Sequence, residues 1–64
     1  MENEVTKLLA NMVEQFQDAA YDAQKFTEGN NSAGTRVRKA MQNIKNLAQQ
    51  VRLEVQHQKN SVTA

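Results

Sequence analysis

Two long apolar stripes with helical spacing, separated by one short break, constrain this chain more than any other feature. In each stripe the apolar residues recur in alternating steps of four and three, which marks one face of an α-helix; a strand would alternate every second residue. The first stripe contains Val5, Leu9, Met12, Phe16, Ala19, Ala23 and Phe26, widened by Leu8, Val13 and Ala20. The second contains Val37, Met41, Ile44, Ala48, Val51 and Val55, with Ala40 and Leu47 beside it. Because the chain also lacks proline, we expect an all-α fold.

The break between the stripes reads Glu28-Gly29-Asn30-Asn31-Ser32. Gly29 suits the left-handed residue that ends a helix. Any of the three polar residues that follow it can accept a backbone N–H bond as the N-cap of the next helix. The break therefore predicts a helix end followed at once by a helix start.

These signals predict one domain, residues 1–64, with helices over about 3–28 and about 32–59. A connection this short makes the two helices antiparallel neighbours, which is an αα-hairpin. Residues 60–64 carry neither a cap nor a strong helical preference, so we expect them to fray.

A chain of 64 residues is small for a stable monomer, because a domain of this size buries only about 60% of its unfolded surface. A second hairpin would complete the core, so we expect a homodimeric four-helix bundle, or a higher homo-oligomer. The expected oligomer and core seam comprises Leu9, Met12, Phe16, Val37, Met41, Ile44 and Val51. Tyr21 and Leu53 lie off both stripes, either as partner contacts or as isolated surface residues.

The absence of cysteine excludes disulfides and thiolate zinc sites, and it suits a reducing compartment. The N-terminus has no charged segment followed by an apolar core, and no apolar run approaches the roughly 18 residues of a membrane span. We therefore expect a cytoplasmic protein without a membrane partner.

Catalysis is not expected. Glu54-x-x-His57 matches half of a di-iron motif, but this is the only histidine and both side chains are expected to point away from the apolar face. Glu14, Asp18 and Asp22 form a ridge of carboxylates that is better explained as a solvated face. With no Gly-rich phosphate loop and no nucleophile beside a base, we expect no metal, no cofactor and no small-molecule substrate.

Charge is distributed unevenly although the net charge is only +1. Residues 1–32 carry two bases and six acids, which gives −4, and residues 33–64 carry six bases and one acid, which gives +5. Such asymmetry suggests an anionic partner for the second half. A helix whose cations are merely solvated is the alternative explanation.

Four cations on the second helix are each seven residues apart: Arg38, Lys45, Arg52 and Lys59. At a rise of 1.5 Å per residue they form one ridge with steps of about 10.5 Å, beside the apolar stripe. The ridge is a candidate phosphate-binding surface. Alternatively, the long stems cover the stripe while the charged heads stay in water.

Arg36, Arg38 and Lys39 also crowd the start of the second helix, where the helix dipole makes cations unfavourable. Together with free N–H groups and the small residues Ala33 and Gly34, they predict a cradle for phosphate. Stability alone does not explain this cluster, which favours a functional role.

At these residues the sequence resembles the chlamydial and Bacteroidetes linker-histone-like family. The most specific part of the match is Gly29-Asn30-Asn31-Ser32-Ala33-Gly34-Thr35-Arg36-Val37-Arg38-Lys39, and the resemblance extends from about Phe26 to His57. It implies a nucleoid-associated, non-enzymatic DNA-binding protein whose basic residues include Arg36, Arg38, Lys39, Lys45 and Arg52. Longer family members carry a Lys/Ala-rich C-terminal tail. This chain looks like the short form without it.

We therefore expect nonspecific binding to the phosphates of double-stranded DNA, weak and salt-sensitive because few cations are available. No aromatic residue is expected on the basic surface, so single-strand recognition and base reading are not expected. The alternative function is a structural adaptor, in which the hairpin binds another protein.

Overall fold

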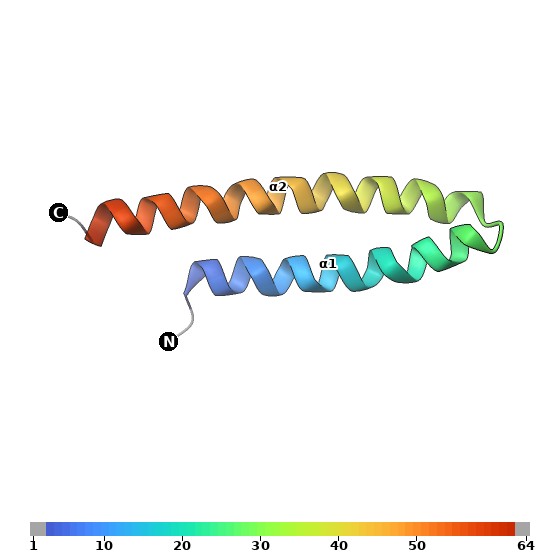
Figure 1. Ribbon diagram of the computed structural model, residues 1–64, viewed down its shortest axis with the longest axis horizontal. Coiled ribbons are helices and arrows are strands. Elements are labelled where there is room, and N and C mark those ends of the chain that lie inside the picture. Colours follow the sequence, from blue (N-terminus) through green and yellow to red (C-terminus); the bar gives the residue numbers. More distant parts are fainter. Residues whose placement is uncertain (1–2, 63–64) are drawn as a thin grey trace.

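The computed structural model describes residues 3–62, and it is an antiparallel helical hairpin (Figure 1). Helix α1 spans Glu4–Thr27 and helix α2 spans Asn31–Val62. The hairpin is long and thin, with extents of 54 × 20 × 10 Å. The sequence-based prediction of an all-α chain with two helices is confirmed, and the helix bounds lie within a few residues of those expected.

The turn is built as the sequence predicts. Gly29 has a φ of +104°, and its N–H donates to the carbonyl oxygen of Phe26 at 2.9 Å, while the N–H of Asn30 donates to that of Lys25 at 3.0 Å. This pair of bonds is the Schellman motif, which satisfies carbonyls left over at a helix end. Of the three candidate N-caps, Asn30 takes the role, because its Oδ1 accepts from the N–H of Ala33 at 3.1 Å.

At the other end of the hairpin, an amide pair ties the start of α1 to α2. Asn3 caps α1 by accepting from the N–H of Val5 at 2.8 Å. The side chains of Asn3 and Gln58 also exchange two hydrogen bonds, of 2.9 and 2.8 Å, and Gln58 donates to Glu54 at 3.1 Å. We call the Asn3–Gln58 pair the latch. It fixes the register of the two helices at the end away from the turn.

Helix α2 continues beyond the latch and past the start of α1 (Figure 1). The sequence predicts fraying from residue 60, but the helix includes Asn60 and Ser61. Local side-chain bonds explain the difference: Ser61 Oγ donates to the carbonyl oxygen of His57 at 3.1 Å, and Gln56 Nε2 donates to Asn60 Oδ1 at 3.1 Å. Residues 63 and 64 lie outside the described residues.

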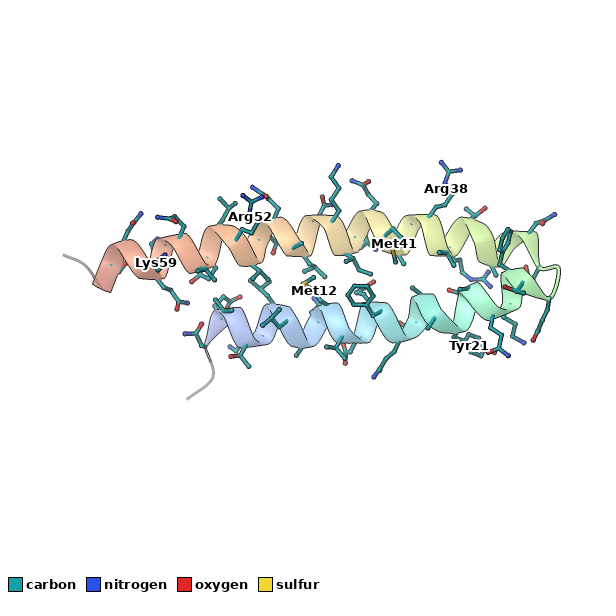
Figure 2. The ribbon with its side chains drawn as sticks, viewed as in Figure 1. Met12, Tyr21, Arg38, Met41, Arg52 and Lys59 are labelled. Atoms are coloured by element: carbon teal, nitrogen blue, oxygen red, sulfur yellow. The ribbon has the colours of Figure 1, made fainter. Side chains whose placement is uncertain are left out.

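The line of contact between the helices is rotated from the expected one. On each helix most of the less exposed residues fall on one line of the helical wheel, which marks the contact. In α1 they are Val5, Leu8, Met12, Gln15, Ala19 and Asp22, and in α2 they are Ala33, Val37, Ala40, Ile44, Leu47, Val51, Glu54 and Gln58. Met12 points between the helices, whereas Tyr21 points away (Figure 2). Leu9, Phe16 and Met41 belong to the expected oligomer and core seam, yet all three are exposed in the hairpin.

The rotation follows from the width of the apolar stripes, which exceed what one neighbouring helix can cover. On a wheel of 100° per residue, the contact line lies about 40–50° from the centre of each stripe. Asp22 is accommodated in the contact because it faces a cation on α2, described below. Among the described residues, only Ala19, Ala33 and Ile44 are buried.

Several of the remaining apolar residues, together with Gly34, form a second surface, which we call the open face. It consists of Leu9, Val13, Phe16, Ala20 and Ala23 from α1, and Gly34, Met41, Ala48 and Val55 from α2. Both sets lie about 90° around their helix from the contact line. Because the helices are antiparallel, these rotations bring the two sets to the same side of the hairpin.

Replacing Gly29 with alanine is expected to destabilise the fold by about 1–2 kcal/mol, the cost of a Cβ in a left-handed conformation. The space around Gly29 is open, so the effect comes from the backbone alone. Urea denaturation followed by circular dichroism measures it. Ser32→Ala, at an exposed position in the first turn of α2, is the control and should change stability by less than about 0.5 kcal/mol.

Candidate nucleic-acid interface

The four heptad-spaced cations of α2 lie along one edge of the open face. Arg38 stands on the side of α2 away from α1 (Figure 2). We call Arg38, Lys45, Arg52 and Lys59 the basic row. Helical rise places its first and last members about 32 Å apart, which is close to one turn of B-DNA, about 34 Å.

Three members of the row have no acidic partner in the described part of the chain. Neither Arg38, Lys45 nor Arg52 has a described carboxylate within the 4.0 Å of an ion pair, and all three residues are exposed. Their charges are therefore available to an external anion. The α1 residues that border the open face on its other edge, Thr6, Gln17 and Gln24, are neutral.

Arg36 has a structural role that its spacing along the sequence does not indicate. Its Nε lies 3.0 Å from Oδ1 of Asp22, and the side chains are 52% and 17% exposed. The bond joins α1 to α2 near the turn. A partly exposed ion pair contributes at most about 1 kcal/mol to the free energy of unfolding. The pair nevertheless explains why Arg36 stands near the start of α2 and why the acidic Asp22 lies in the contact line. Asp22 therefore does not belong to a purely solvated carboxylate ridge.

The structure does not bring the three cations at the start of α2 together. On the helical wheel, Arg38 and Lys39 are about 100° apart, and Arg36 is about 160° from Arg38. With the helix beginning at Asn31, Arg38 and Lys39 lie in its third turn, beyond the first turn where the dipole acts. The helix dipole therefore gives no reason to assign these cations to a functional cluster.

The small residues of the expected cradle also serve the fold. Ala33 is 0% exposed and its N–H is bonded to Asn30. A Cβ on Gly34 would lie 2.6 Å from Cδ1 of Phe26, so the missing side chain makes room for the aromatic ring. The close approach that Gly34 permits is made by a residue of the same chain.

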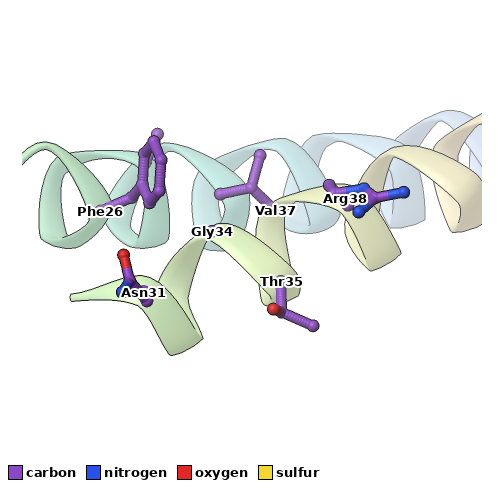
Figure 3. Close-up of a pocket in the computed structure, with 7 residues that line it drawn as sticks. Phe26, Asn31, Gly34, Thr35, Val37 and Arg38 are labelled. Atoms are coloured by element: carbon purple, nitrogen blue, oxygen red, sulfur yellow. The ribbon is translucent and has the colours of Figure 1, made fainter.

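Phe26 was predicted as part of the first apolar stripe, and no aromatic residue was expected on the basic surface, but Phe26 lines one pocket together with Arg38. Figure 3 shows its ring beside Gly34 and Val37, with Arg38 farther along α2. All four residues line an open pocket of about 390 Å³. The pocket is mainly apolar, and Ala23, Asn31 and Thr35 complete its lining. Only the three-dimensional register brings Phe26 to the start of α2, so spacing along one helix did not reveal it.

The other candidate residues lie apart from this surface. Glu54 is half-buried at the contact between the helices, where it was expected to point outward, and it accepts from Gln58 at 3.1 Å. His57 is exposed. Between residues 3 and 62 there is no cluster of three potential metal-ligating side chains. Neither described helix is long and apolar enough to cross a lipid bilayer.

The fold and its charges define a small two-helix module with a basic edge beside an uncovered apolar face. Residues 6–61 match the family model described as Histone H1-like protein Hc1. The chain therefore belongs to that histone-like family, which confirms the resemblance seen in the sequence. No curated protein and no solved structure matches the chain.

Proposed function

We propose that this protein is a non-enzymatic, nucleoid-associated DNA-binding protein that contacts the phosphates of double-stranded DNA along the basic row. The observation that carries the proposal is that Arg38, Lys45 and Arg52 have no described carboxylate partner, in a member of a histone-like family. Lys and Arg on one edge of a helix supply the charge that phosphate binding needs. Arg36 and Lys39 lie toward the other side of α2 and are secondary candidates.

Binding without sequence specificity is the mode that these residues favour. The row offers point charges about 10.5 Å apart, and phosphate contacts carry no direct sequence information. A net charge of +1 implies weak binding that falls steeply with salt, because affinity follows the number of phosphates neutralised.

We propose further that the protein acts as a homodimer. The hairpin exposes 5142 Å², whereas a compact monomer of 7.2 kDa would expose about 4,100 Å². The excess of about 1,000 Å² is close to the roughly 800 Å² that each partner buries in a standard interface. The open face supplies apolar surface for this interface. It also favours the second candidate function, an adaptor that binds a different protein there.

Replacing Lys45 and Arg52 with glutamine is expected to weaken DNA binding equally on unrelated duplex sequences. Each lost phosphate contact should flatten the log–log dependence of affinity on salt by about 0.9, which gives about 1.8 for the pair. Fluorescence anisotropy across a salt series measures both quantities. Glutamine retains helix preference, so the change tests charge.

The matched control is Lys7→Gln with Lys25→Gln, which removes the same charge from α1. This variant should keep a larger salt slope than the Lys45 and Arg52 variant. Equal losses in both would mean that only net charge matters and would refute a specific basic row. A third variant, Arg36→Gln with Lys39→Gln, measures the contribution of the other side of α2. An adaptor predicts no salt-dependent DNA affinity in any variant.

A further inference from the structure

Two hollows on α2 share the same spacing. The first is the pocket near the turn, and its α2 lining includes Asn31, Gly34, Thr35 and Arg38. The second has a volume of about 420 Å³ and is lined by Lys45, Asn46, Ala48, Gln49 and Arg52. Both contain residues at positions i, i+3, i+4 and i+7, which is the arrangement that receives one side chain of a facing helix in knobs-into-holes packing.

The hollows alternate with large side chains along the open face. At heptad spacing α2 presents Gly34, Met41, Ala48 and Val55, which are small, large, small and large. Met41 and Val55 are 42% and 39% exposed, so both project from the hairpin. Gly34 and Ala48 lie at the hollows. A facing helix with the reverse order would fill each hollow with a large side chain.

An antiparallel copy of α2 has that reverse order, and we propose that the homodimer forms by packing α2 on α2 of a second copy across a two-fold axis. Met41 then enters the hollow at the second copy's Ala48. Val55 enters the second copy's hollow near the turn, where it packs against the Phe26 ring that covers Gly34. Each contact is repeated by symmetry. The axis passes between Ile44 and Lys45. This arrangement rests on the homodimer proposed above and specifies its interface.

Helix α1 independently supports the same axis. Its open-face residues Leu9, Phe16 and Ala23 are also at heptad spacing, and antiparallel pairing about Phe16 sets Leu9 against Ala23 of the second copy. The latch joins residues 3 and 58, so counting thirteen residues inward along each helix sets position 16 across from position 45. The two pairing centres therefore agree to within about one residue, or 1.5 Å along the helix.

The arrangement has a consequence for charge. With α2 on α2, the two basic rows lie side by side along one edge of the dimer, so Lys45 lies near its symmetry mate and Arg38 near Arg52 of the second copy. The dimer then presents a doubled row of cations to a single DNA duplex. In the other two-fold arrangement, with α1 on α2, the rows would lie on opposite sides.

Cysteine cross-linking tests the register, since the natural chain has no cysteine. Chains carrying Met41→Cys are mixed with chains carrying Ala48→Cys and oxidised with glutathione disulfide. The mixture is expected to give a covalent dimer of twice the 7.2 kDa chain mass. Either variant alone should give far less, because its two cysteines are offset by about 10.5 Å along the helix, beyond the 4.4–6.8 Å Cα separation of disulfides.

Sedimentation of the unmodified chain, together with the cross-linking, separates the homodimer proposal from the proposal that α2 packs on α2. A monomer at micromolar concentration overturns the homodimer and this arrangement with it, and leaves the DNA-binding proposal to the salt series. A dimer whose Met41→Cys and Ala48→Cys chains do not cross-link to each other overturns this arrangement alone. Efficient cross-linking of Phe16→Cys chains to Ala48→Cys chains overturns it equally, because it indicates α1 on α2.

A size swap gives a second test that needs no cysteine. Met41→Ala leaves the hollow at the second copy's Ala48 unfilled. Ala48→Met fills that hollow with a side chain of its own helix, so that the second copy's Met41 no longer fits. Each substitution is therefore expected to raise the dimer dissociation constant about tenfold or more. The double variant Met41→Ala, Ala48→Met restores a large–small pair at every contact and should recover most of the loss. Additive losses in the double variant would contradict the proposed pairing.

Discussion

Replacing Phe16 with glutamate is expected to raise the dimer dissociation constant more than about a hundredfold, because it leaves uncompensated charges in an interface, at about 3–5 kcal/mol for each such charge. In the isolated hairpin this side chain is 51% exposed, and a charge there would be tolerated. The proposed dimer instead brings two copies of residue 16 together at the symmetry axis. Analytical ultracentrifugation at several concentrations measures the change.

Tyr21→Glu is the matched control, an aromatic-to-acid change on the same helix. Tyr21 is 64% exposed and points away from α2, and Lys25 lies 5.4 Å from the centre of its ring. A glutamate at position 21 can pair with Lys25 one helical turn later, so dimerisation and stability should stay close to those of the unmodified chain. Equal, small effects of both substitutions would show that residue 16 faces solvent in solution.

Truncating Ile44 to alanine is expected to lower the free energy of unfolding by about 2–5 kcal/mol. Ile44 is the largest of the buried side chains among the described residues, at 8% exposure, and it lies at the middle of the helix contact. Small domains have total stabilities of only about 5–15 kcal/mol, so much of the fold should be lost. Urea denaturation followed by circular dichroism gives the value.

Leu53→Ala is the control for this substitution, because Leu53 is a large apolar residue of α2 that is 60% exposed. It should change the unfolding free energy by less than about 0.5 kcal/mol. A loss at Leu53 as large as that at Ile44 would mean that Leu53 is covered in the assembled protein, and so that the interface includes the outer side of α2.

Helical periodicity was sufficient to predict the two helices, their antiparallel order and the role of Gly29, because each depends on residues close together in sequence. The direction of the helix contact that periodicity predicts differs by about 40–50° from the direction in the structure. The centre of each stripe lies about midway between the contact line and the open face, so the stripes point between the two surfaces. Such a direction is expected when each helix has two neighbours, as in a four-helix bundle.

The candidate site was predictable only in part, for a related reason. The heptad spacing of the basic row is a property of one helix and could be found from sequence. The Arg36–Asp22 bond and the fit of Phe26 over Gly34 join residues on different helices. They depend on the register that the turn and the latch impose. Without that register, Arg36 was grouped with Arg38 and Phe26 was left out of the basic surface.

The latch also determines how the hairpin responds to mechanical force. The start of α1 and the end of α2 lie at the same end of the rod (Figure 1), so tension between them pulls the helices apart sideways rather than sliding one along the other. The two hydrogen bonds between Asn3 and Gln58 then carry the load first, and the pairs behind them separate in turn toward Gly29. The hairpin therefore opens as a zipper, with low resistance spread over a long extension.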